Sequence, residues 1–316
     1  MSTLTVASQF APASPLKRLL ARHPILGYFA IAFGGTWGLL LAPVLAQNGI
    51  GLLPFMVPDI ALMILFVMAT LAGPTLGAIV MTAVTSGRPG LRHFFRRYVQ
   101  VRVGLRWYLL ALLGLPLIVL LAASIYSGLA ASQTVLAQWP LLFTAYLPAM
   151  LFSMIMPALV EEPGWRGYAL PRLERRYGPL PASLLLGLLH QAWHLPVFFM
   201  TVGIMAEGPF DAGVFAYRIF SSMVLAVIWT WVFNNARGSI FMAIVLHGAN
   251  NGAGLLIHEW GSAFSTAAVN TMGDILLLVC AVLIILFTRG RLSYIPGLAA
   301  QLIDPAPSAD LPAPQL

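Results

Sequence analysis

The sequence contains few charged residues. Lys, Arg, Asp and Glu make up 9% of its 316 residues, whereas 59% are hydrophobic and the mean hydropathy is +0.87. Soluble globular domains carry about 25% charged residues, and this chain has too few to cover a soluble surface. The composition therefore predicts an integral membrane protein.

Cysteine and the common hydrolase signatures are also scarce. Cys280 is the single cysteine in the sequence, so neither an intramolecular disulfide nor a cysteine-rich metal site can form. The sequence contains neither an H-E-x-x-H motif nor a G-x-S-x-G motif. These absences exclude the usual sequence signatures of zinc proteases and serine hydrolases.

Long hydrophobic runs are abundant. A helix needs roughly 20 mostly apolar residues to cross about 30 Å of hydrocarbon. Runs of this kind predict an all-α, polytopic bundle of eight transmembrane helices. We expect residues 1–15 to be flexible, residues 16–300 to form one membrane domain, and residues 301–316 to form a disordered, proline-rich tail. The predicted spans lie near residues 24–46, 58–84, 105–130, 137–160, 180–202, 216–234, 238–257 and 273–288.

The basic residues follow this topology. If both termini are cytoplasmic, 16 of the 17 Lys and Arg residues fall in cytoplasmic segments, and only Arg218 falls on the other side. Positively charged loops resist translocation, so this asymmetry fixes the orientation. The opposite segments contain Asp59, Glu207, Asp211 and Glu259. The basic residues of these cytoplasmic segments account for the net charge of +7, and no nucleic-acid partner is expected.

Residues 91–99 alternate basic and aromatic side chains before the third span. We expect this segment to lie along the cytoplasmic headgroups of the bilayer. Its arginines, including Arg96 and Arg97, would snorkel to anionic lipid, while Phe94, Phe95 and Val99 would enter the acyl boundary.

Two adjacent carboxylates, Glu161 and Glu162, end the fourth hydrophobic run, and Arg166 follows. Ionisable groups at membrane depth cost roughly 2.5 to 3.5 kcal/mol, which makes them functional candidates. Pro163 and Gly164 predict a kink or a new helix at this point. Glu162 and Arg166 are four residues apart and can form an ion pair, leaving Glu161 free to act as a base in a cavity. The alternative is that both carboxylates form a solvated cytoplasmic helix end.

Two further polar pairs occur in the fifth and seventh runs. His190 and His194 are four residues apart and share a helical face. Histidine is a proton-transfer partner of carboxylates and the commonest zinc ligand, although either residue alone could be a core histidine bonded to a carbonyl. His247 and Asn251 also share a face and could donate hydrogen bonds to a developing oxyanion. Together these groups indicate hydrolysis of an acyl bond by activated water.

These residues resemble the CPBP family of intramembrane proteases, the CAAX-protease and bacteriocin-processing group also called Abi. The resemblance covers roughly residues 140–255. It implies an eight-helix fold with a cavity open toward the cytosol and the membrane. Glu161 and His194 would then activate water, and His247 and Asn251 would stabilise the oxyanion. The E-E-x-x-x-R motif falls on Glu161, Glu162 and Arg166, the F-x-x-x-H motif on positions 190–194, and the H-x-x-x-N/D motif on His247 and Asn251.

His190 departs from the family pattern, which usually has Phe at this position. If zinc were used, Glu161, His190, His194 and His247 would be its candidate ligands. We favour a mechanism without a metal or other cofactor, in which Glu162, Arg166 and His190 support the catalytic groups.

The sequence therefore predicts an intramembrane endopeptidase that acts on a peptide or on a membrane-associated protein. Its expected location is a bacterial inner (plasma) membrane, with the active site near the cytoplasmic side. One alternative is a zinc-dependent intramembrane metalloprotease, and another is a non-catalytic immunity or scaffold protein that binds a peptide or partner in the same cavity. A proton-coupled transporter is disfavoured because no internal repeat is visible. The substrate sequence and the oligomeric state stay open.

Overall fold

The computed structural model describes residues 14–202, 209–260 and 265–304. Throughout these ranges the regular elements are helical. Among the described residues, seven helices are long and apolar enough to cross a membrane, and a shorter apolar helix covers Ile240–Leu256. The predicted all-α polytopic class is confirmed. Seven long spans plus this shorter helix take the place of the eight predicted spans.

The chain is almost continuously helical, and several spans are broken by short π- or 3₁₀-helical turns. The bend in α4 lies at Gly87, whose φ of 60° is a left-handed value that glycine adopts readily. The elements, in chain order, are α1 (Pro15–Arg22), α2 (Pro24–Leu45), α3 (Asp59–Thr70), η1 (Leu71–Thr75), α4 (Leu76–Arg96), η2 (Arg97–Val99), α5 (Leu105–Ala137), η3 (Leu142–Tyr146), α6 (Leu147–Ser153), η4 (Met154–Ala158), α7 (Leu159–Glu162), η5 (Pro163–Ala169), α8 (Leu170–Tyr177), α9 (Pro179–Trp193), η6 (Leu195–Phe199), α10 (Ala212–Asn235), α11 (Ile240–Trp260), α12 (Thr266–Thr288) and α13 (Pro296–Ile303).

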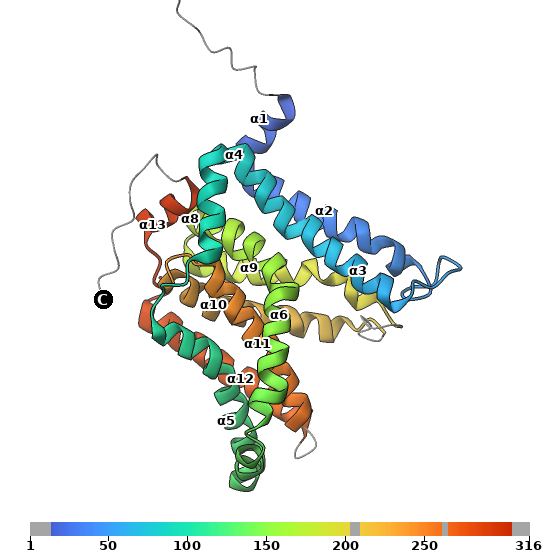
Figure 1. Ribbon diagram of the computed structural model, residues 1–316, viewed down its shortest axis with the longest axis vertical. Helices are drawn as coiled ribbons and strands as arrows, with labels where there is room; N and C mark the ends of the chain where they lie inside the picture. Colours follow the sequence, from blue (N-terminus) through green and yellow to red (C-terminus); the bar gives the residue numbers. More distant parts are fainter. Residues whose placement is uncertain (1–13, 203–208, 261–264, 305–316) are drawn as a thin grey trace, which may run out of the picture.

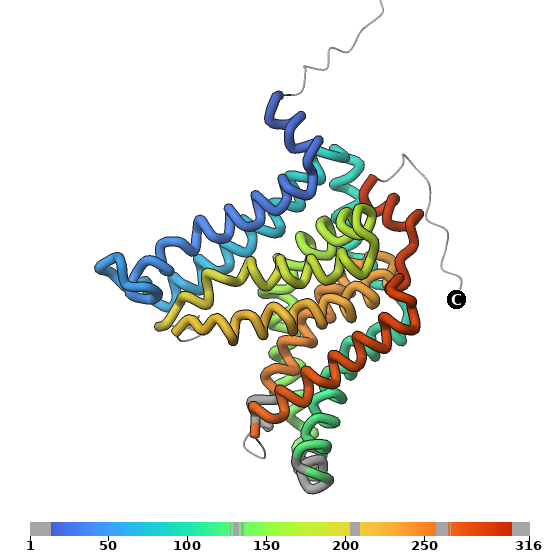
Figure 2. The backbone as a smooth tube through the Cα atoms, turned by 180° about the vertical axis from the view of Figure 1, so that it is seen from behind, coloured from blue at the N-terminus to red at the C-terminus, as the bar shows by residue number. Residues whose placement is uncertain are grey.

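The long helices form two arms that diverge from a common base (Figures 1 and 2). One arm contains α2, α3, α9 and α10, and the other contains α5, α6, α11 and α12. A buried core around Tyr28, Trp165 and Trp193 joins α2 and α4 to η5 and α9. A second core around Trp107 and Tyr146 joins α5 to η3 and α11. The segment from α7 to α8 lies where the two arms meet.

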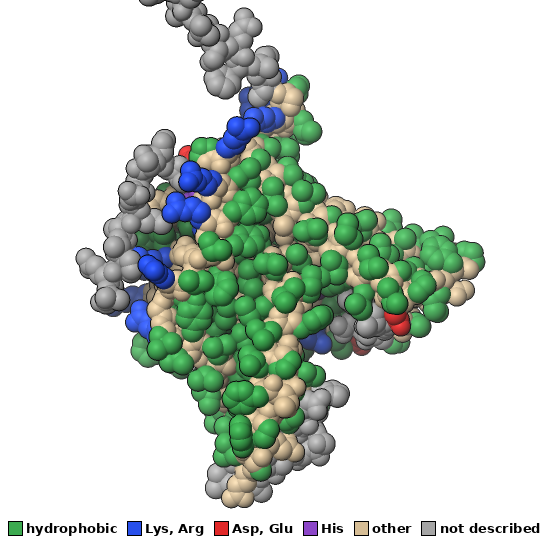
Figure 3. All heavy atoms as spheres, in the orientation of Figure 1, with side chains coloured by type: hydrophobic (Ala, Val, Ile, Leu, Met, Phe, Trp, Pro, Cys, Tyr) green, Lys and Arg blue, Asp and Glu red, His purple; other side chains and the backbone are tan. Residues whose placement is uncertain are grey.

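Charge is segregated over the surface. On the face drawn in Figure 3, Lys and Arg side chains gather along the edge formed by α1 and the bent end of α4. The distal parts of both arms show mainly hydrophobic side chains on this face. This distribution agrees with the orientation that the sequence predicts, in which the basic end faces the cytoplasm.

The prediction for residues 91–99 is wrong at two positions. Phe94 is buried in the core that contains Trp165, and the Arg97 side chain is 1% exposed. Arg97 donates from Nε to the Gly238 carbonyl and from Nη1 to the Gly167 carbonyl, both at 2.8 Å. Its guanidinium thus satisfies carbonyl groups inside the protein and does not reach lipid headgroups. An amphipathic pattern cannot distinguish a face packed on protein from one packed on lipid.

Both ends of the predicted domain differ from their predicted bounds. Helix α13 runs to Ile303, three residues into the predicted tail, and Ser86 Oγ donates to the Ile303 carbonyl at 3.0 Å. Residues 301–303 are therefore ordered against α4. Of the predicted flexible N-terminus, residues 14 and 15 are described: Ser14 caps α1 and Pro15 begins it. Residues 1–13 and 305–316 lie outside the described residues, as does Glu207.

Candidate active site

The two adjacent carboxylates are buried at the centre of the molecule. Glu161 and Glu162 are 1% and 0% exposed, so the alternative of a solvated helix end is wrong. The helix continues through them as the π-helical turn η5, where Pro163 lacks a backbone N–H. A Cβ at Gly164 would lie 2.6 Å from the Pro74 Cβ and carbonyl oxygen, so glycine permits η5 to pack tightly against η1.

Glu162 accepts hydrogen bonds from two neighbouring side chains. Arg166 donates from Nη1 to Glu162 Oε1 at 2.9 Å, which confirms the ion pair predicted from their spacing. His247 donates from Nδ1 to the same oxygen at 2.8 Å. The Arg166 guanidinium also lies 4.4 Å from the centre of the Trp229 ring. Glu162 therefore orients a cation from its own helix and an imidazole from α11.

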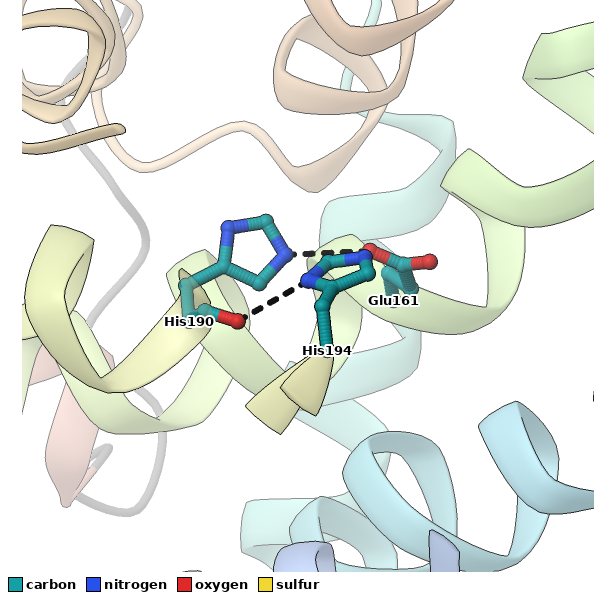
Figure 4. A group of neighbouring side chains, drawn as sticks. All are labelled: Glu161, His190 and His194. Atoms are coloured by element: carbon teal, nitrogen blue, oxygen red, sulfur yellow. Dashed lines mark hydrogen bonds and ion pairs between the residues drawn. The ribbon is translucent and has the colours of Figure 1, made fainter. Parts of the chain in front are cut away.

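Glu161 points toward His190 of α9 and toward His194, the residue that follows this helix, as Figure 4 shows. His190 Nε2 lies 3.1 Å from Glu161 Oε2, and His194 Nδ1 lies 3.0 Å from the His190 carbonyl oxygen. A carbonyl can only accept, so the His194 proton is on Nδ1, and the neutral ring keeps a lone pair on Nε2. His194 thus offers a base or ligand atom whose tautomer is set by the backbone of its own helix.

Tryptophans hold these imidazoles in place. The Trp165 ring centre lies 4.9 Å from that of His190, and Trp193 meets His194 edge-on at 4.6 Å. Trp193 donates from Nε1 to the Ala32 carbonyl at 3.2 Å, which links it to α2. Our sequence reasoning did not assign a role to these tryptophans. The sequence could have identified them by position, because Trp165 lies inside the E-E-x-x-x-R segment and Trp193 lies beside His194.

The third pair lies on α11. Asn251 donates from Nδ2 to Ser153 Oγ at 2.7 Å, which ties its amide to α6. A Cβ at Gly248 would lie 2.5 Å from Met154 Cγ, so glycine permits η4 to approach α11 closely. Ser153 is a site residue that sequence reasoning missed, because no spacing rule connects it with a residue 98 positions later.

A cavity of about 400 Å³ brings the predicted residues together. Glu161, His190 and His194 line it from α7 and α9, and His247 and Asn251 line it from α11. Arg166 also contributes to the lining, whereas Glu162 lies behind it. The cavity is completed by residues that sequence reasoning did not single out, among them Phe66, Phe198, Arg218, Ser221 and Trp229.

Part of this set could hold a metal ion. Glu161, His190 and His194 each offer one ligand atom, and these atoms all lie within 4.8 Å of one another. Two imidazole nitrogens and one carboxylate oxygen are a donor set that suits zinc with an open position for water. His247, the fourth candidate ligand, is not part of this group, and its Nδ1 is bound to Glu162.

Two comparisons with known proteins find related proteases. Residues 143–253 match the family model described as type II CAAX prenyl endopeptidase Rce1-like. The chain is 28% identical over 187 residues to a protein named CAAX prenyl protease 2 from Methanococcus maripaludis, an alignment that covers 58% of this chain and 69% of the relative. These matches confirm the resemblance to the CAAX-protease (CPBP) family.

The region that matches the CAAX-protease model contains all seven residues predicted for the site, from Glu161 to Asn251. It covers the chain from η3 to α11, including the part where the two arms meet. The chain is thus a multi-pass helical membrane protein related to proteases, and most of the residues that line its cavity lie within the matched region.

Proposed function

We propose that the protein is an intramembrane endopeptidase in which Glu161 activates a water molecule. The supporting observation is the convergence of one buried carboxylate and three imidazoles, from three separate segments, on one cavity. Hydrolysis of a peptide bond needs a general base for water and donors for the oxyanion. The two walls of the cavity can supply these two functions separately.

Glu161 is the proposed general base. It takes a proton from water while the water oxygen bonds to the carbonyl carbon, and the carbonyl π electrons move to its oxygen. Collapse of this tetrahedral intermediate breaks the C–N bond, and Glu161 returns the proton to the leaving nitrogen. His194 Nε2 can accept the second hydrogen bond of the water. His190 is a positioning residue, because its Nε2–H donates to Glu161 Oε2.

His247 and Asn251 are the proposed oxyanion donors. His247 Nδ1 is held by Glu162, so a protonated His247 would direct its Nε2–H into the cavity, and the Glu162 carboxylate would stabilise that imidazolium. One amide hydrogen of Asn251 binds Ser153, which leaves the second for the substrate. Each such donor contributes roughly 3 to 4 kcal/mol in a site without water.

Zinc dependence is the second candidate mechanism. Glu161, His190 and His194 would hold the ion, which would act as a Lewis acid on water. We favour the metal-free mechanism because the carboxylate and its two imidazoles already form a proton-transfer arrangement. Metal analysis of the purified protein, together with the effect of a chelator on activity, separates the two. Stoichiometric zinc together with chelator-sensitive cleavage would overturn the metal-free mechanism.

The test of the proposed function is cleavage of peptides by purified protein in detergent, read by mass spectrometry. We expect Glu161→Gln and His194→Ala to lose cleavage while keeping their elution profile and melting temperature. Cleavage that survived in both variants would refute the proposal. A non-catalytic binding role would instead be indicated if the Glu161→Gln variant supported the cellular function as well as the unmodified protein.

We place the protein in a bacterial inner membrane with its basic end in the cytoplasm. The orientation in this proposal is supported by the segregation of Lys and Arg side chains to one end of the bundle. The proposed substrate is a peptide or a segment of a membrane-associated protein, as the name of the relative suggests for its own substrate class.

A further inference from the structure

A second cavity, of about 430 Å³, lies at the basic end of the bundle. It is enclosed by α1 and the first turn of α2, by α8, and by the last residue of α13, elements that lie in the upper part of the molecule in Figure 1. The residues that line it are not those of the catalytic cavity. We call it the basic cavity, and its polar lining consists of Arg22, His23, Thr85, Arg172, Arg175 and Arg176.

The basic cavity concentrates positive charge. Four of its lining residues are arginines, whereas none of the described residues that line it is Asp or Glu. Glu174 of α8 is buried outside the basic cavity, where it accepts a hydrogen bond from Asn234 at 2.7 Å. Asp304, the residue after α13, attracts Arg172 electrostatically, but the two form no ion pair in the described part of the chain. Like charges brought this close repel one another, so an anion in the basic cavity would relieve the repulsion.

Arg172 is held in place with donors to spare. Its side chain is buried, and its residue is 7% exposed. Nη1 donates to the Tyr168 carbonyl at 3.1 Å, and the guanidinium lies 3.6 Å from the centre of the Tyr168 ring. An arginine presents five N–H donors in a planar fork, and this carbonyl takes one of them. The remaining donors suit the oxygens of a phosphate group, which arginine binds with two parallel hydrogen bonds.

The start of α2 supplies further donors on the other side of the basic cavity. Its first three residues, Pro24, Ile25 and Leu26, line the cavity, and no side chain caps this end of the helix. The Gly27 N–H donates to the His23 carbonyl at 2.8 Å, as the first backbone hydrogen bond of the helix. The N–H groups of Ile25 and Leu26 precede it and have no intrahelical acceptor. A helix start of this kind favours an anion through its free N–H groups and its dipole.

Apolar surface begins directly beside these donors. Leu26 lines the basic cavity and is 66% exposed, and α2 is long and apolar enough to span a membrane from Pro24 onward. Helix α1 places the exposed side chains of Leu16 and Leu19 among basic residues, a pattern typical of helices at a membrane surface. The basic cavity therefore lies where the first span leaves the hydrocarbon, which is the level of the lipid phosphate groups. A phospholipid could use both the charged cavity and the apolar rim, whereas a free phosphate ion would use only the charge.

We propose that the basic cavity binds the phosphate group of an anionic phospholipid. Arg172, Arg175 and Arg176 hold the phosphate from α8, and the start of α2 holds it from the other side. The acyl chains lie along the apolar surface that begins at Leu26. Basic pockets between transmembrane helices are suited to anionic headgroups for the same electrostatic reason. The bound lipid joins the first span to α8, the helix that continues from η5.

The test compares two pairs of arginines that carry the same charge. Arg175→Gln/Arg176→Gln removes two charges from the basic cavity, and Arg92→Gln/Arg96→Gln removes two from exposed positions on α4 outside it. The full chain is purified in an uncharged detergent. Native mass spectrometry then gives the dissociation constants for phosphatidylglycerol, which is anionic, and for phosphatidylcholine of equal chain length, which is zwitterionic.

We expect one phosphatidylglycerol to bind the unmodified protein at least about tenfold more tightly than phosphatidylcholine does. The cavity variant should bind phosphatidylglycerol about 25-fold more weakly, because each arginine near an anionic headgroup contributes about fivefold. The α4 variant should stay within about twofold of the unmodified protein, because salt screens exposed charges outside the cavity. Phosphatidylglycerol should also raise the melting temperatures of the unmodified protein and the α4 variant more than that of the cavity variant.

Three results would overturn the proposal. One is equal affinity of the unmodified protein for the two lipids. The second is a cavity variant that binds phosphatidylglycerol no more weakly than the α4 variant does, which would indicate attraction to the basic end as a whole. The third is displacement of phosphatidylglycerol by inorganic phosphate at equal concentration, because the basic cavity would then be a site for free phosphate.

A second comparison on α1 covers the case in which the cavity variant melts below the unmodified protein without lipid. Arg22→Gln removes a charge that lines the basic cavity, and Arg18→Gln removes an exposed charge of the same helix outside it. We expect about fivefold weaker binding of phosphatidylglycerol for Arg22→Gln alone. Equal binding by these two variants would count against the proposal. No readout in either comparison depends on peptide cleavage.

Discussion

Substitution by glutamine should mainly reduce stability at Glu162 and mainly reduce catalysis at Glu161. Glu162 accepts hydrogen bonds from both Arg166 and His247, and Arg166 is 3% exposed. Glu162→Gln removes the negative charge and leaves the buried guanidinium without its ionic partner. Breaking a buried pair in this way costs about 3 to 5 kcal/mol. Glu161 is bonded to His190, which can be neutral, so Glu161→Gln should cost less than about 1 kcal/mol.

These free energies translate into separable measurements. At roughly 2 °C or more per kcal/mol, Glu162→Gln should lower the melting temperature in detergent by about 6 °C or more. Glu161→Gln should leave the melting temperature nearly unchanged while reducing kcat by about 10²-fold or more, since it removes the general base. Thermal unfolding and peptide cleavage on the same preparations provide both readouts.

Glu174→Gln is the matched control. Glu174 is a buried carboxylate outside the cavity, where Asn234 donates to it from Nδ2 at 2.7 Å. It should keep wild-type kcat, which would show that replacing the carboxyl group of a buried glutamate does not by itself abolish cleavage. The reasoning would be refuted if Glu161→Gln lowered the melting temperature as much as Glu162→Gln, or if Glu162→Gln left it unchanged.

Three further substitutions test other parts of the site. His190→Phe restores the usual family residue and should retain cleavage within about tenfold, because a positioning hydrogen bond is worth about 1 kcal/mol. If this variant lost both its bound zinc and all cleavage, the metal-free mechanism would be contradicted. Gly164→Ala should lower the melting temperature by several degrees, because its Cβ meets backbone and ring atoms of η1, whereas Gly34→Ala, with open space around it, should not. Asn251→Ala should reduce kcat by about 10²- to 10³-fold with little change in KM. Asn235→Ala, outside the cavity, should keep wild-type kcat. An equal reduction of kcat in both variants would argue against Asn251 as an oxyanion donor.

Local spacing explains which parts of the site could be predicted from the sequence. Glu162 and Arg166, and likewise His190 and His194, are four residues apart on helices, so the helix itself brings each pair together. The contact between Glu162 and His247 joins residues 85 positions apart and depends on how α11 packs against α7. No periodicity in the sequence records that packing, so Glu162 was predicted to bind Arg166 but not His247.

The lipid-facing and protein-facing sides of helices were equally hard to separate. In a soluble protein a buried face differs from an exposed one by its hydrophobicity, but in a membrane both faces are apolar. Phe94 and Phe95 are adjacent and chemically identical, yet Phe94 is 3% exposed and Phe95 is 47% exposed. Only the position of η5 beside α4 decides between them.

Arg97 links the basic end of the bundle to the site. Its guanidinium joins η5 to the segment before α11 through the Gly167 and Gly238 carbonyls. These two elements carry Arg166 and His247, which both bind Glu162. Loss of the carbonyl contacts would leave a buried arginine unpaired. Arg97 therefore stabilises the packing on which the contact between Glu162 and His247 depends.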